Sequence, residues 1–140
     1  MALPTKFQLQ IVSADRSLVN ETVDEAVIPG ADGYFGVLPG HTPLLALLGA
    51  GELWYRQGQE RTYFAIAFGF AEVQPENVTI LAEIAEKADE IDVARAEAAK
   101  QRAEQRLMQS TVDMDAERAR IALMKSLIRL QVSTRARIRS

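Results

Sequence analysis

The first 86 residues alternate apolar and polar positions in short runs, the period-two pattern typical of strands that bury one face. The alternation is clearest in residues 7–12, 52–56 and 77–81. Turn-forming stretches such as residues 29–33 and 57–59 separate these runs. Many short strands at this spacing predict an all-β sandwich or flattened barrel over residues 1–86.

From residue 87 the pattern becomes helical. Downstream of Glu86 the chain has no glycine, proline or aromatic residue, and strong helix formers prevail. We predict a first helix with Asp89 as N-cap, running to about Met108, and a second helix with Asp113 or Asp115 as N-cap after an interruption at residues 110–113. The inward positions expected at helical spacing are Ile91, Ala94, Ala98 and Leu107, then Ala116, Leu123, Leu127 and Leu130. The predicted fold is therefore α+β in two segregated parts, with an antiparallel helical hairpin over residues 87–140.

Composition excludes several classes of site. The chain has no cysteine and one histidine, so disulfides, thiolate metal sites and histidine clusters cannot form. The glycines of residues 30–40 are not followed by the Lys-Ser or Lys-Thr of a phosphate loop. Apolar stretches are far shorter than the roughly 20 residues of a membrane helix, and the N-terminus lacks a signal-peptide core. We expect no catalytic residue, no metal, no required cofactor, and membrane association only through a protein partner.

Charge is segregated along the chain. After Glu117 there is no acidic residue, and the basic residues that follow are Arg118, Arg120, Lys125, Arg129, Arg135, Arg137 and Arg139. A helix this basic suits an acidic protein surface, a nucleotide phosphate or nucleic acid, and the simplest alternative is a solvated helix face. Nucleic acid fits least, because no aromatic residue lies among these charges to stack on bases.

Residues 29–45, PGADGYFGVLPGHTPLL, contain enough glycine and proline to specify one ordered turn system. This string resembles the epsilon subunit of bacterial F-type ATP synthases residue by residue, and Gly49 and Gly51 supply the glycine that opens the next strand in that family. Residues 9–13, 69–81 and 91–96 continue the resemblance in the same order. It covers essentially the whole chain.

The resemblance implies a non-catalytic rotor subunit in the central stalk of a proton-translocating ATP synthase, peripheral on the cytoplasmic face of the plasma membrane. The β-domain would bind the gamma subunit and meet the polar loops of the c-subunit ring, coupling ring rotation to ATP synthesis. The contact residues implied are Gly33, Tyr34, Phe35 and His41. Many relatives carry an acidic or polar residue where this chain has Tyr34, so we expect aromatic packing there in place of a charge contact.

Residues 91–96, IDVARA, have two interpretations. Taken alone they form the first turn of a helix, with an acid near its positive end and an arginine one turn later. The family resemblance implies instead an ATP-binding motif, with Ile91, Asp92, Arg95 and Ala96 at its specified positions. Arg95 and Arg102 can meet phosphate oxygens, and Asp92 can accept from an adenine amino group or a ribose hydroxyl. Weaker candidates for the same site are Glu86, Arg118, Lys125 and Arg129.

The resemblance also implies that the hairpin moves. Folded on the β-domain it would accept ATP as a regulatory ligand, and extended along gamma toward the alpha and beta subunits it would inhibit ATP hydrolysis. The basic contacts to those catalytic subunits would be Arg118, Arg120, Lys125 and Arg129. The alternative function is a free-standing ligand-sensing adaptor that presents a mobile helical hairpin to an acidic protein.

Overall fold

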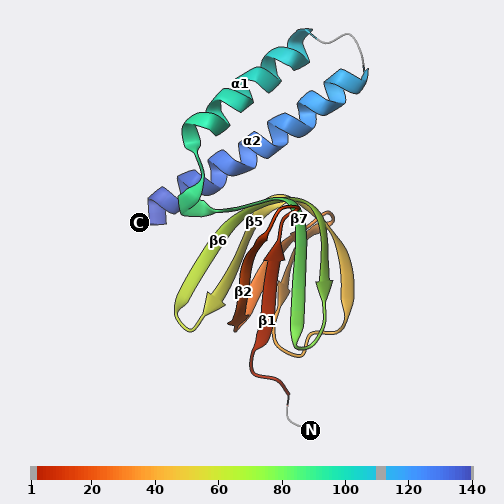
Figure 1. The fold of residues 1–140 in the computed structure, drawn as a ribbon, viewed down its shortest axis with the longest axis vertical. Helices are drawn as coiled ribbons and strands as arrows, with labels where there is room; N and C mark the ends of the chain where they lie inside the picture. The colour runs from red at the N-terminus through yellow and green to blue at the C-terminus, as the bar shows by residue number, and fades with distance from the viewer. Residues whose placement is uncertain (1–2, 110–112, 140) are drawn as a thin grey trace.

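The computed structural model describes residues 3–109 and 113–139, and these form a β-sandwich with a helical hairpin at one end (Figure 1). The strands are β1 (Phe7–Val12), β2 (Ser17–Val23), β3 (Glu25–Gly30), β4 (Gly33–Val37), β5 (Leu44–Gln57), β6 (Glu60–Val73) and β7 (Asn77–Lys87). They pair in the order β2-β1-β7-β6-β5-β3-β4, antiparallel except for the parallel pair β1–β7. The predicted sandwich is confirmed.

The single sheet folds into two layers because its long strands bend. In β6 the residues facing the main core are Phe64 and Ile66 before the bend, and Ala71 and Val73 after it. Between them Phe68 has φ 60° and Gly69 has φ 122°, and this backbone reverses the strand's alternation. Glycine is required at 69, since a Cβ there would collide with the carbonyl oxygen of Leu81.

The main core lies between the two layers. Its largest fully buried side chains come from all seven of the described strands, and they include Phe7, Leu9, Ile11, Ile28, Leu53, Ile66 and Ile80. Burying an aliphatic side chain of this size contributes about 1.5–3 kcal/mol. The sandwich therefore has a core of its own, separate from the helices.

After β7 come a 3₁₀ turn, η1 (Ala88–Glu90), and two antiparallel helices, α1 (Val93–Gln109) and α2 (Asp113–Arg139). The predicted hairpin is confirmed. Its start and its end lie at the sandwich, and its far end points away (Figure 1). A second apolar cluster joins the two parts and consists of Ala65, Ala88, Ile91, Ile128 and Val132.

The predicted N-cap of the first helix is wrong. Asp89 lies within η1, and Asp92 is the cap, because its Oδ1 accepts the backbone N–H of Arg95 at 3.1 Å. Ile91 between them is extended, with φ −72° and ψ 127°, which places its side chain in the second cluster and delays the helix. Asp113 and Asp115 both lie within the first turn of α2, and residues 110–112 of the predicted interruption at 110–113 fall outside the described residues.

Three predicted inward positions are also wrong. Ala94 and Ala98 are exposed, while Ala96 and Ala103 are the buried alanines of α1. Leu127 is 46% exposed, because Ile128 and Val132 are the buried apolar residues of α2 in the second cluster. A helix with alanines on several faces has no single apolar stripe, so spacing alone could not choose its inner face.

Candidate functional site

A cavity of about 750 Å³ opens where the sandwich meets the base of the hairpin. The sandwich contributes the turn before β2, part of β2, one residue each of β5 and β6 and the end of β7, and the hairpin contributes one residue of η1, the start of α1 and one residue of α2. The lining residues are Arg16, Leu18, Val19, Glu21, Tyr55, Phe64, Ala85, Glu86, Lys87, Glu90, Asp92, Arg95, Ala96, Ala99, Arg102 and Arg129. This volume lies within the range of small-ligand sites.

Six of the nine predicted nucleotide contacts line this cavity: Glu86, Asp92, Arg95, Ala96, Arg102 and Arg129. The helical period explains part of the grouping, because residues three or four positions apart lie on the same side of a helix. The lining residues of α1 and its N-cap that are related by this spacing are Asp92, Arg95, Ala96, Ala99 and Arg102. Strand β7 of the sandwich contributes Glu86, and α2, the other helix of the hairpin, contributes Arg129.

The other three predicted contacts lie elsewhere. Ile91 is buried in the second apolar cluster, where it joins the hairpin to the sandwich. Arg118 lines a separate cavity of about 390 Å³ with Arg106 and Asp115. The Nζ of Lys125 pairs with Glu83 Oε2 at 3.3 Å.

The cavity holds both paired and available cations. Arg129 is committed to Glu86, with its Nε 2.9 Å from Glu86 Oε1. Arg95 and Arg102 form no ion pair with any residue that the structure describes, so their guanidinium groups are open to an anionic ligand. Asp92 uses one carboxylate oxygen for the helix cap, which leaves the other for a ligand donor.

Apart from Glu86, sequence reasoning missed the sandwich side of the cavity. Arg16 and Lys87 add cations, Glu21 and Glu90 add acids, and Tyr55 and Phe64 form a stacked pair with ring centroids 6.3 Å apart. Burial raises the pKa of Tyr55 above its ordinary value of 10.0, so it stays a neutral phenol near pH 7. Lys87 follows a predicted contact directly, but nothing in the local sequence relates Arg16 to α1.

Within residues 3–109 and 113–139, four ion pairs join α2 to the sandwich in addition to the second apolar cluster. They are Lys125–Glu83, Arg129–Glu86, Arg135–Glu52 and Arg139–Glu52. Of the four predicted basic contacts to catalytic subunits, Lys125 and Arg129 are thus engaged with the sandwich. Arg120 is exposed and pairs at 3.0 Å with Glu117 on its own helix.

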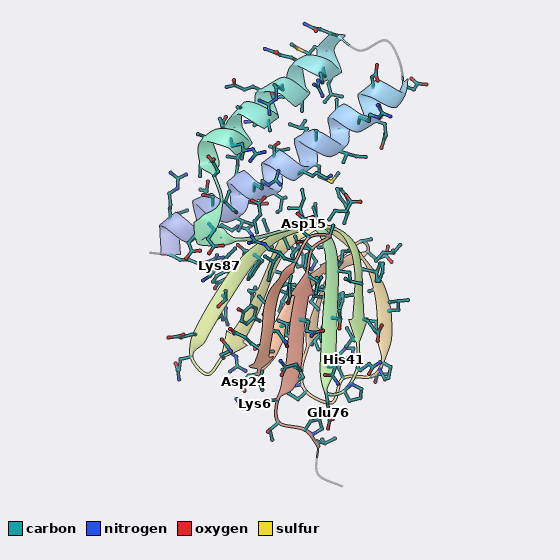
Figure 2. The ribbon with its side chains drawn as sticks, viewed as in Figure 1. Lys6, Asp15, Asp24, His41, Glu76 and Lys87 are labelled. Atoms are coloured by element: carbon teal, nitrogen blue, oxygen red, sulfur yellow. The ribbon has the colours of Figure 1, made fainter. Side chains whose placement is uncertain are left out.

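The segment predicted to meet the c-subunit ring has different surroundings at its two ends. Gly33 and Tyr34 are exposed, and the Tyr34 hydroxyl accepts the backbone N–H of Glu52 at 3.0 Å. Phe35 packs against the main core. His41 lies at the end of the sandwich away from the helices (Figure 2), with its Nδ1 2.6 Å from the carbonyl oxygen of Thr42.

An apolar patch covers part of the sandwich's outer surface. Leu47 of β5 is 71% exposed and pairs with Phe70 of β6, which in turn pairs with Leu81 of β7. Leu45, also exposed, lies two residues before Leu47 on the same side of the strand. Contiguous apolar surface of this kind marks a docking face in soluble proteins.

Within residues 3–109 and 113–139, no helix is long and apolar enough to cross a membrane. The same residues contain no cluster of three or more acidic or histidine side chains placed to hold a metal ion.

Two family models together match residues 6–134. Residues 6–88 match the beta-sandwich domain of the ATP synthase delta/epsilon chain, and residues 89–134 match its long alpha-helix domain. A sandwich followed by this hairpin thus defines the delta/epsilon class of ATP synthase chains.

Individual relatives distinguish the epsilon chain within the delta/epsilon class. The chain is 48% identical over 128 residues to the ATP synthase epsilon chain of Syntrophobacter fumaroxidans, covering 91% of this chain and 96% of the relative. It is 53% identical over 104 residues to that of Koribacter versatilis, covering 74% and 73%. This chain belongs to the ATP synthase epsilon chain family, and the resemblance seen in the sequence is confirmed.

Solved structures agree with the fold. A chain in the structure of Euglena gracilis mitochondrial ATP synthase, OSCP/F1/c-ring, superimposes with a TM-score of 0.80 at 26% identity, covering 99% of this chain and 84% of that one. A chain in the central stalk/c-ring structure of Tetrahymena thermophila mitochondrial ATP synthase gives a TM-score of 0.59 at 15% identity, covering 96% and 98%. At 15% identity the second likeness concerns the fold alone.

Proposed function

We propose that this chain is a non-catalytic rotor subunit in the central stalk of a proton-translocating F-type ATP synthase. Its place would be peripheral, on the cytoplasmic face of the plasma membrane, held there by the complex. Membership in the epsilon chain family and the likeness to a chain from an F1/c-ring assembly support this proposal. The subunit couples rotation of the c-subunit ring to ATP synthesis in the catalytic head.

The sandwich is the part that docks to the rotor. The apolar patch of Leu45, Leu47, Phe70 and Leu81 suits the gamma subunit, because a partner there would remove large side chains from water. Exposed Tyr34 offers the ring of c subunits an aromatic surface and no charge. His41, at the far end of the sandwich, presents a second contact to the same partners.

The hairpin binds ATP as a regulatory ligand, and no cofactor is required. The observation that carries this proposal is the cavity in which six predicted contacts meet. Arg95 and Arg102 would hold phosphate oxygens, while Asp92 and Glu86 would accept from the base or the ribose. Arg129, which pairs with Glu86, is close enough to exchange that partner for a phosphate.

Regulation follows from where the cavity lies. Its walls come from the sandwich, α1 and α2, so the site exists only while the hairpin is docked. ATP that binds only the docked form draws the population toward that form. When the hairpin extends toward the alpha and beta subunits, Arg118, Arg120, Lys125 and Arg129 can pair with acidic surfaces there and block hydrolysis.

Isothermal titration of the full chain with ATP tests the nucleotide site. We expect saturable binding that Arg95→Ala weakens at least tenfold, because a charge-assisted phosphate contact contributes about 1.4 kcal/mol or more. Arg106→Ala is the matched control, since Arg106 is an arginine of the same helix that lines the other cavity. Absence of heat up to millimolar ATP, or equal weakening by both variants, would rule out this site.

The inhibitory role has its own test in the assembled enzyme. Deleting residues 88–140 should raise ATP hydrolysis while the sandwich, which has a separate core, stays in the complex. An unchanged rate of hydrolysis with the truncated subunit incorporated would refute inhibition by the hairpin.

A further inference from the structure

Glu52 of β5 is a buried carboxylate at the point where α2 ends. The residue is 5% exposed, and both of its carboxylate oxygens accept from Arg139, Oε1 from Nη2 at 3.0 Å and Oε2 from Nη1 at 3.2 Å. Arg135, one turn earlier in α2, approaches Oε1 at 3.6 Å. The guanidinium of Arg139 also lies 3.6 Å above the ring of Tyr63. A two-point arginine–carboxylate contact over an aromatic ring is a specific, oriented interaction.

The burial of Glu52 depends on the hairpin. Successive side chains of a strand point to opposite faces of the sheet. Leu53 of β5 faces the main core, so the side chain of its neighbour Glu52 points outward, where α2 covers it. A carboxylate removed from water is costly unless it is paired. Among the residues that the structure describes, the cations paired with Glu52 both belong to the last turns of α2. The carboxylate is therefore compensated only while α2 is docked.

Strand β5 is held in place at Glu52 by contacts that do not involve the hairpin. The backbone N–H of Glu52 donates to the hydroxyl of Tyr34 at 3.0 Å. Tyr34 lies so close to Gly51 that a Cβ on Gly51 would collide with the Tyr34 hydroxyl. The backbone that carries the acceptor for α2 is thus held by contacts within the sandwich.

We propose that Glu52, Arg135 and Arg139 form a latch that locks the C-terminal end of α2 onto the sandwich. Opening the latch returns Glu52 to water and frees two arginines for an acidic protein surface. The inference rests on the proposed function in one respect, namely that the hairpin leaves the sandwich. It adds an electrostatic contact that sets how readily the hairpin does so, at residues distinct from the nucleotide cavity.

The fraction of docked hairpin in the full-length chain tests the latch. The protein has no cysteine, so Glu60→Cys on the sandwich and Gln105→Cys on α1 can carry a pair of distance-reporting labels. Low urea brings the undocked form into the measurable range. We expect Arg139→Gln and Glu52→Gln each to lower the ratio of docked to undocked protein roughly tenfold, a value reduced for the partial exposure of Arg139.

A double-mutant cycle decides whether the two residues act together. The Glu52→Gln/Arg139→Gln variant should lose little more than either single variant, because the second change removes a partner already lost. Arg120→Gln is the matched control, since Arg120 pairs within α2 and should leave the ratio unchanged. Additive losses, or a change of less than twofold in Arg139→Gln, would overturn the latch.

The latch and the proposed function can fail separately. Release in the labelled chain with unchanged ATP hydrolysis in the assembled enzyme keeps the latch and contradicts regulation by the hairpin. An unchanged docked fraction contradicts the latch and leaves ATP binding at Arg95 to its own titration.

Discussion

Replacing Val132 with alanine measures how strongly apolar packing holds the hairpin to the sandwich. Val132 is 0% exposed and lies in the second cluster with Ala65, Ala88, Ile91 and Ile128. Losing two buried methyl groups removes about 1.6 kcal/mol of transfer free energy at roughly 0.8 kcal/mol each. The cavity left behind raises the cost to about 2 kcal/mol. That value corresponds to an approximately 30-fold lower ratio of docked to undocked protein.

The assay is the labelled full-length chain described for the latch, combined with urea unfolding of the sandwich followed by the fluorescence of Trp54. The docked ratio should fall about 30-fold while the urea midpoint of the sandwich stays constant, because Val132 packs outside the main core. Ile138→Ala is the control, since Ile138 is 79% exposed and its truncation should cost less than about 0.5 kcal/mol.

Two results would refute this reasoning. A fall of less than threefold would mean that ion pairs, and not the apolar cluster, hold the hairpin. A parallel loss in the sandwich's own stability would mean that hairpin and sandwich unfold as one cooperative unit.

Two further predictions concern the sandwich. Gly69→Ala should lower the free energy of unfolding by about 2–4 kcal/mol in urea titrations, because φ 122° and the carbonyl of Leu81 leave no place for a Cβ. Gly36→Ala is the control: a Cβ at residue 36 meets open space, so this variant should change the free energy of unfolding by less than about 0.5 kcal/mol. A loss in Gly69→Ala no larger than in Gly36→Ala would contradict the strained bend. The backbone N–H of Gly58 and the Lys6 ammonium hold the pKa of Asp24 below its ordinary value of 3.8. The Asp24 carboxylate therefore stabilises the fold above pH 3.8, and this stabilisation is lost as the pH falls through the pKa of Asp24 in the folded protein. Asp24→Asn should accordingly be less stable than the parent chain at pH 7 and converge with it in strong acid, and a difference that stays constant with pH would count against this account.

Much of the architecture was accessible from local sequence patterns. Period-two alternation and turn residues predicted the sandwich, and the loss of glycine, proline and aromatic residues after Glu86 predicted the hairpin. The family resemblance of residues 91–96 implied α1's side of the cavity, and the helix gathers these side chains because residues three and four apart share a face. The family was readable for a similar reason, since its defining residues form contiguous strings.

Other features depended on contacts between distant segments. Asp92 rather than Asp89 caps α1, because Ile91 is drawn into a cluster with Ile128 and Val132 of the other helix. Ala96 rather than Ala94 faces inward for the same reason, since that docking sets the rotation of the helix. Arg16 reaches the cavity only through the turn between β1 and β2.

Propensity and periodicity act over a few residues, so local patterns were enough to predict the two parts and their order, while contiguous motifs carried the family resemblance that implied the helical half of the candidate site. Tertiary structure decided which helix faces are buried, where β6 bends, and that Glu52, polar in an outward position of β5, is covered by α2. Burial and pairing of a side chain depend on which surfaces meet in three dimensions, and that information is not local to any segment of the chain.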